Sequence, residues 1–140
     1  MHIRTTKWAG FSIFVAATLQ CTGPSPGVGG DGTPVLGRWG GRHVGLTLTE
    51  AGGSVEYDCA HGGISAPIRP GGDGRFEIGG VHVREHGGPV RIDDVPDSVP
   101  ARYVGRISRD RMTLRVIVGA DTLGPFELER DAVPLLVKCL

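Results

Sequence analysis

Polar and apolar side chains alternate residue by residue through most of the chain beyond position 43. In residues 43–50, Val44, Leu46 and Leu48 share one parity, and glycine or threonine lies between them. The same period of two recurs in residues 54–59, 101–108 and 111–118. Because successive side chains of a β-strand point to opposite faces, this period predicts half-buried strands. No helical period stands out beyond residue 35.

Short glycine-rich or polar segments separate these strands and predict tight turns, which accounts for many of the 24 glycines. Further strands are expected over residues 36–41, 75–78, 81–85, 123–129 and 135–139. About eight short antiparallel strands must bury one face and protect their edges. We therefore predict that residues 35–140 form an all-β domain, a small antiparallel β-barrel of about eight strands, with a β-sandwich as the alternative.

Charge is evenly balanced along the chain, with 15 Lys and Arg against 15 Asp and Glu. A protein that holds nucleic acid through its phosphates needs a basic field, and this composition supplies none overall. The sequence therefore predicts no nucleic-acid partner. The length of 140 residues is sufficient for one domain with a hydrophobic core.

Residues 1–20 have the composition of an export signal. Arg4 and Lys7 are followed by an uncharged, mostly apolar run over residues 8–19. As a helix, about 12 residues would extend only about 18 Å, which is short of the roughly 30 Å hydrocarbon core of a membrane. We interpret residues 1–20 as a signal peptide.

Cys21 follows this signal directly. Its placement resembles that in bacterial lipoprotein signals, in which the cysteine becomes the lipidated first residue of the mature chain. The resemblance implies a lipid anchor on Cys21, with the membrane as partner, and a location in the cell envelope. Cleavage after Ala17 without a lipid is the alternative. Residues 21–34 contain Val28 as their one large apolar side chain and predict a flexible tether.

Cys59 and Cys139 are the remaining cysteines if Cys21 carries lipid. An even number of cysteines in an oxidising compartment favours a disulfide, so we predict a bridge between these two. A catalytic thiol or a metal ligand at Cys59, with His61 as its partner, is the alternative. It is less favoured, because residues two apart in a strand lie about 6.6 Å from each other along the axis.

Residues 82–86, HVREH, match the spelling of the H-x-x-E-H zinc motif. That motif requires a helix, whereas glycine pairs flank this segment and the alternation over residues 81–85 predicts a strand with His82 facing solvent. In a strand His82 and His86 would lie about 13 Å apart, too far to bind one zinc ion. We therefore predict no metal site and no cofactor.

Other matches to catalytic sequence motifs are also incomplete, so no catalytic residue is predicted. Ser65 is followed at position 67 by proline, where a nucleophile elbow requires glycine. Binding is instead expected on the turn-rich segments 60–74 and 86–100, because loops on a rigid scaffold often carry function. A weak calcium site is conceivable on three acidic residues, Asp93, Asp94 and Asp97.

The segment LGRWGG, residues 36–41, opens the first expected strand. Its Gly37 and Trp39 resemble the G-x-W of the first strand in lipocalins and related calycin barrels. In those families the tryptophan plugs one end of the barrel and packs beneath a basic side chain from a late strand. The resemblance implies such a plug here, with Arg130 or Lys138 as the cation.

The wider pattern of residues 36–140 resembles that of small exported bacterial lipoproteins of unknown function. Taken together, these features predict a non-enzymatic, membrane-tethered barrel in the cell envelope that binds a protein partner. The first alternative is a lipocalin-like carrier of a small apolar ligand, and the second is a protease inhibitor or an enzyme. Bulky side chains expected inside the barrel favour a filled interior: Leu46, Leu48, Met112, Leu114, Phe126 and Leu128.

Overall fold

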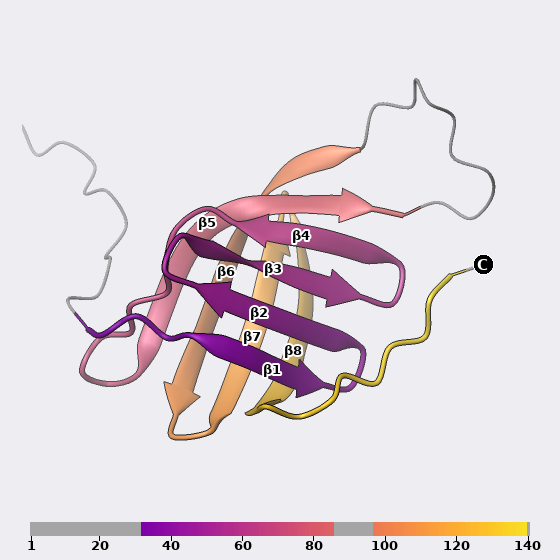
Figure 1. Ribbon diagram of the computed structural model, residues 1–140. Coiled ribbons are helices and arrows are strands. Elements are labelled where there is room, and N and C mark those ends of the chain that lie inside the picture. Colours follow the sequence, from indigo (N-terminus) through magenta and orange to yellow (C-terminus); the bar gives the residue numbers. More distant parts are fainter. Residues whose placement is uncertain (1–31, 86–96, 140) are drawn as a thin grey trace, which may run out of the picture.

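Eight antiparallel strands close into a barrel in the computed structural model, which describes residues 32–85 and 97–139 (Figure 1). The strands are β1 (Gly37–Gly41), β2 (Val44–Thr49), β3 (Gly52–Tyr57), β4 (Ala60–Ile64), β5 (Arg75–Arg84), β6 (Ser98–Ser108), β7 (Arg111–Val118) and β8 (Asp121–Arg130). Each strand pairs with the next, and β8 pairs with β1 to complete the ring. The predicted barrel is confirmed, and the β-sandwich alternative is wrong.

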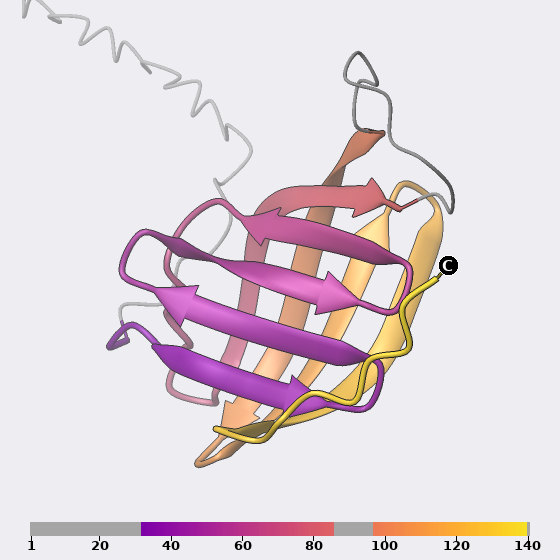
Figure 2. The ribbon, with the colours of Figure 1, turned by 45° about the vertical axis from the view of Figure 1, so that its right-hand side comes forward.

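The two halves of the barrel differ in strand length. Strands β1 to β4 contain 5 or 6 residues each, whereas β5 to β8 contain 8 to 11. Figure 2 shows the four short strands as one wall and the long strands behind them. Inward-facing side chains from both walls meet in a single apolar core, which includes Val44, Val55, Tyr103, Leu114 and Val116.

Strand β4 lies at the start of residues 60–74, which we expected to be a loop. The strand is hard to see in the sequence because the inward position at Gly62 carries no apolar side chain, so polar and apolar residues do not alternate there. A Cβ atom on Gly62 would lie 2.2 Å from the hydroxyl of Tyr103, so the tyrosine occupies the space where a side chain would point. The Tyr103 hydroxyl donates a hydrogen bond to the carbonyl of Val81 at 2.7 Å.

The two strands expected over residues 75–78 and 81–85 are one continuous strand, β5. Pairing with β6 runs unbroken through the glycine pair, with Gly79 opposite Arg102 and Gly80 opposite Ala101. Here too the glycine makes room for tyrosine, because a Cβ atom on Gly80 would lie 2.7 Å from the ring of Tyr103.

The strand expected over residues 135–139 is absent from the barrel. Residues 132–139, the C-terminal segment, form one isolated parallel bridge, between Arg42 and Leu135. The physical reason is closure, since β1 and β8 already pair with each other and leave no free edge for a ninth strand.

Of the two cations expected at Trp39, Arg130 lies against the tryptophan ring and Lys138 does not. Trp39 is 1% exposed, and the guanidinium carbon of Arg130 lies 4.4 Å from the centre of its ring. Gly37 has a φ of +99°, a conformation that favours glycine, and Arg130 Nη1 would lie 3.7 Å from a Cβ at that position. The assignment of Lys138 to the plug is wrong: its Nζ donates to Glu56 at 2.9 Å.

Candidate functional site

A cavity of ≈ 730 Å³ opens at the end of the barrel where β1, β3 and β5 finish (the arrowheads of these strands in Figure 1). Tyr57 and Ala60 line it from the β3–β4 wall, His82 from β5, and Leu123 and Phe126 from β8. We call this cavity the mouth. Its volume falls within the range of about 300–1,000 Å³ that is typical of small-molecule sites.

An irregularity in β8 gives the mouth its apolar wall. Residues three apart in a regular strand point to opposite faces. The pairing of β7 with β8 shifts between Leu114 and Val116, so that Phe126 lies opposite Leu114 and Leu123 lies opposite Val116. Both Leu123 and Phe126 therefore pack against the core. The adjacent Gly124 and Pro125 are the sequence signal that could have indicated this irregularity.

Two polar side chains in the mouth are buried without a partner. Tyr57 and His82 are 6% and 5% exposed, and their ring centres lie 5.6 Å apart. Neither Tyr57 Oη nor His82 Nδ1 has a hydrogen-bond partner among residues 32–85 and 97–139. A buried polar atom left unpaired costs about 1–3 kcal/mol. The third such atom among the described residues, Trp39 Nε1, does not line the mouth.

Both groups are uncharged at neutral pH. Burial raises the pKa of the Tyr57 hydroxyl, and the neighbouring Tyr103 raises it further. Burial lowers the pKa of His82; the charges of Arg84 and His61 also lower this pKa, against an opposing effect of Asp97. The mouth therefore offers neutral hydrogen-bonding groups at its wall.

The burial of His82 corrects the expectation that this side chain faces solvent. Because β5 is continuous, its inward parity is set by Phe76 and runs through Gly80 to His82, and Val81 is 42% exposed instead. His86, the second histidine of HVREH, lies outside the described residues. In the described part of the chain there is no group of three or more His, Cys, Asp or Glu residues that could hold a metal ion.

The rim of the mouth ties the C-terminal segment to the barrel through Asp58. Its carboxylate lies 2.5 Å from His43 Nδ1 and accepts a hydrogen bond from the backbone of Val137 at 2.8 Å. The hydrogen bond from the backbone of Val137 lowers the pKa of Asp58, and the hydrogen bond from His43 lowers it to a smaller extent. Cys59 and Cys139 lie at disulfide distance beside it, with Cα atoms 5.2 Å apart, as we expected.

A second polar cluster flanks the rim on the outer wall. His61 Nδ1 lies 3.0 Å from Glu85 Oε1. This hydrogen bond lowers the pKa of the Glu85 carboxyl, and the hydrogen bond from Lys138 lowers it to a smaller extent. The hydrogen bond to Glu56 is the largest of the effects that raise the pKa of Lys138. These groups are largely exposed, and exposed ion pairs contribute little to stability. His61 thus pairs with Glu85 and not with Cys59.

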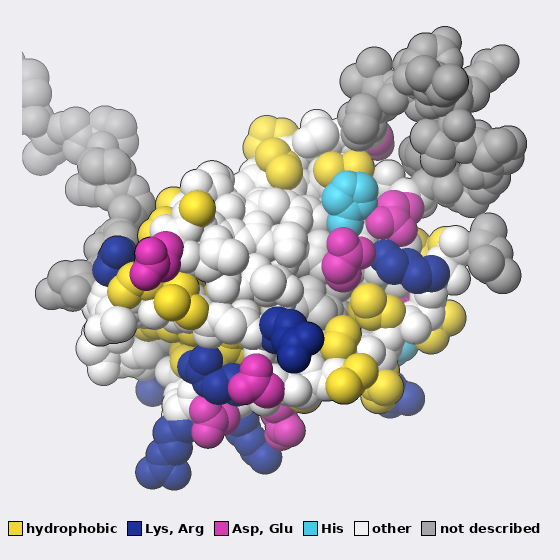
Figure 3. Space-filling view, viewed as in Figure 1, with side chains coloured by type: hydrophobic (Ala, Val, Ile, Leu, Met, Phe, Trp, Pro, Cys, Tyr) yellow, Lys and Arg dark blue, Asp and Glu magenta, His cyan; other side chains and the backbone are white. Residues whose placement is uncertain are grey.

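An exposed apolar row follows the C-terminal segment at the lower right of Figure 3. Its side chains alternate along the chain, and Val133, Leu135 and Val137 are 81%, 67% and 68% exposed. Rows of this kind occur at protein interfaces. The expected envelope protein partner stays a prediction.

The remaining sequence candidates do not converge on a site. Ser65 Oγ donates to the carbonyl of Gly79 at 2.7 Å, so its hydroxyl serves the backbone. Cys21, Asp93 and Asp94 lie outside the described residues, and Asp97 is exposed. Among residues 32–85 and 97–139, no helix is long and apolar enough to cross a membrane.

Comparison of the chain with protein-family models, with curated proteins and with solved structures finds no match. The resemblances to calycin barrels and to small exported lipoproteins therefore stay predictions.

Proposed function

We propose that the protein is a non-enzymatic, exported barrel that binds a small, mainly apolar molecule in its mouth. The observation that carries the proposal is the pair of buried, unpartnered polar atoms on Tyr57 and His82, set in a cavity walled by Leu123 and Phe126. Small-ligand sites combine such apolar walls with a few placed polar groups. This is the lipocalin-like alternative from the sequence, placed at one end of the barrel.

The chemistry of the wall limits the ligand. An ion at Tyr57 and His82 would compete with ion pairs that the cavity lining already makes, those of Asp58 with His43 and of Glu85 with His61. An uncharged hydroxyl or carbonyl instead matches the two neutral groups. The ligand stays at the mouth, because the interior beyond it is filled: Leu46, Leu48, Met112, Leu114 and Leu128 are all buried.

Paired aromatic probes test both the place and the chemistry of this site. We expect full-length protein to bind 2-naphthol about 5-fold more tightly than naphthalene, since one added hydrogen bond contributes about 1 kcal/mol. Replacing the half-buried Leu123 with tryptophan should fill the mouth and weaken both probes at least about 10-fold. Fluorescence titration measures all of these affinities.

Two comparisons keep this test specific. Leu135→Trp adds the same side chain on the exposed C-terminal segment and should leave both affinities unchanged. Tyr57→Phe should remove the preference for 2-naphthol while naphthalene binds as before. If Leu123→Trp binds both probes like the unmodified protein, the mouth is not the site.

Export and lipidation of Cys21 complete the proposal. They are supported by the signal-like residues 1–20 and by Cys59 and Cys139 lying at disulfide distance, because disulfides persist in oxidising compartments. We expect bacteria expressing the chain to incorporate labelled palmitate into it, and Cys21→Ser to abolish the label. Cys59→Ser is the matched control and should retain it. A label that survives Cys21→Ser would contradict the anchor.

A further inference from the structure

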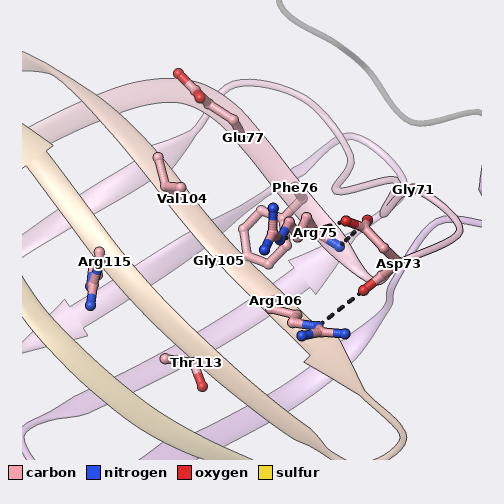
Figure 4. A pocket seen from close by; sticks show the side chains of 10 residues that line it. All are labelled: Gly71, Asp73, Arg75, Phe76, Glu77, Val104, Gly105, Arg106, Thr113 and Arg115. Carbon is pink, nitrogen blue, oxygen red and sulfur yellow. Dashed lines mark hydrogen bonds and ion pairs between the residues drawn. The ribbon is translucent and has the colours of Figure 1, made fainter.

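A second hollow, of ≈ 590 Å³, lies on the outer wall of the barrel over β5, β6 and β7 (Figure 4). Arg75 comes from β5, Val104 and Arg106 from β6, and Thr113 and Arg115 from β7. We call these five residues the arginine groove. Their positions alternate with the inward-facing Phe76, Tyr103 and Leu114, so the strand pattern itself turns three arginines outward on adjacent strands.

Strand register brings the three arginines together. Arg75 lies directly opposite Arg106 across β5 and β6, an arrangement in which like charges repel. Arg106 lies opposite Thr113 and Val104 opposite Arg115, so Arg106 and Arg115 are diagonal neighbours on β6 and β7. Diagonal neighbours lie about 7–8 Å apart, within reach of long side chains. A bound anion would relieve this repulsion.

The carboxylates of the hollow are already engaged. Asp73 Oδ1 accepts from the backbone of Arg75 at 3.1 Å, and Asp73 Oδ2 lies 3.5 Å from Arg75 Nε. Glu77 accepts a hydrogen bond from Arg102, which lies outside the groove. These two acids therefore serve Arg75 and Arg102, and neither forms an ion pair with Arg106 or Arg115.

Arg106 and Arg115 keep their hydrogen-bonding capacity. Arg106 Nε donates to the backbone carbonyl of Asp73 at 3.0 Å, which fixes the guanidinium through one nitrogen only (dashed in Figure 4). Arg115 forms no ion pair with any of the described residues. A guanidinium fork is the group that best matches two oxygens of one phosphate.

We propose that the arginine groove binds a phosphate-type oxyanion through Arg106 and Arg115, beside the ion pair of Arg75 with Asp73. The phosphate can belong to a soluble compound or to a lipid headgroup, because both present the same oxygens to the two forks. This inference is independent of the ligand proposed for the mouth, which lies at one end of the barrel.

Calorimetric titration with inorganic phosphate and pyrophosphate tests the groove. The sample is full-length protein carrying Cys21→Ser, so that no anchor contributes to binding. We expect saturable binding that Arg106→Gln and Arg115→Gln each weaken about 10-fold, the loss of one charged hydrogen-bonding group. Arg106→Lys keeps the charge but loses the fork and should also weaken binding.

Arg111→Gln is the matched control. Arg111 is also exposed on β7, pairs with Glu129 outside the groove, and its loss changes the net charge equally. Affinity should be unchanged by this substitution. Equal weakening by Arg111→Gln and Arg106→Gln, or no phosphate binding in the unmodified groove, overturns the proposal.

Vesicles separate the two sources of phosphate. Cosedimentation with phosphatidylglycerol vesicles that Arg106→Gln reduces, added to the calorimetric result, assigns the oxyanion to a headgroup. Phosphate binding without such cosedimentation supports a soluble phosphate compound. Vesicles of phosphatidylcholine, which carry no net charge, set the background.

Discussion

Replacing both Cys59 and Cys139 with serine should lower the free energy of unfolding by about 4.5 kcal/mol, measured by urea denaturation. The two residues are 80 positions apart, so a bridge between them removes much of the conformational freedom of the unfolded chain. Domains of this size typically have 5–15 kcal/mol of stability, and the loss should therefore be large enough to populate unfolded protein at moderate temperature.

The same substitution should loosen the C-terminal segment before the barrel unfolds. Without the bridge, its last residues are held at the rim by Asp58, which accepts bonds from the backbones of Val137 at 2.8 Å and Cys139 at 3.3 Å. Amide hydrogen exchange at these residues should accelerate while exchange in β6 and β7 follows global stability. Cys21→Ser is the control. An unfolding midpoint that the double substitution leaves unchanged would contradict a bridge.

Trp39→Ala is expected to cost about 3–5 kcal/mol of stability, as is usual when a large buried aromatic side chain is truncated. Trp39 is 1% exposed, and its ring packs beneath the guanidinium of Arg130. Alanine would leave a cavity there and remove the ring that faces the guanidinium. Thermal and urea unfolding of the purified variant measure the loss.

Two further variants separate packing from the cation–π contact. Val133→Ala removes an apolar side chain that is 81% exposed and should change stability by no more than about 0.5 kcal/mol. A double-mutant cycle of Trp39→Phe with Arg130→Met should give a coupling of about 0.5–2 kcal/mol. A stability of Trp39→Ala equal to that of Val133→Ala would show that Trp39 does not plug the barrel.

Much of the fold follows from local pattern. Alternation in β2, β6 and β7 predicted both the strands and the inward side of each, because a strand with one buried face has no other way to place its apolar residues. The buried Leu46, Met112 and Leu114 are examples. Prediction was weakest where glycine replaces the inward side chain, as in β4, since an absent side chain carries no pattern.

The candidate site was harder to predict than the fold. Alternation gives Tyr57 the correct inward parity, but it puts His82 on the wrong face, because the glycine pair before His82 resembles a break in the strand. Leu123 and Phe126 meet in the mouth through an irregularity that alternation cannot reveal. The arginine groove needs three strands in one register, information that no single segment contains.

The strand-rich fold and most core residues follow from the sequence, because the face of a strand to which a side chain points depends only on its position along the chain. The tertiary structure alone decided that Lys138 pairs with Glu56 while Arg130 covers Trp39. It also decided that the C-terminal segment stays outside the sheet. Both outcomes depend on ring closure, which fixes the register of all eight strands together and uses every edge.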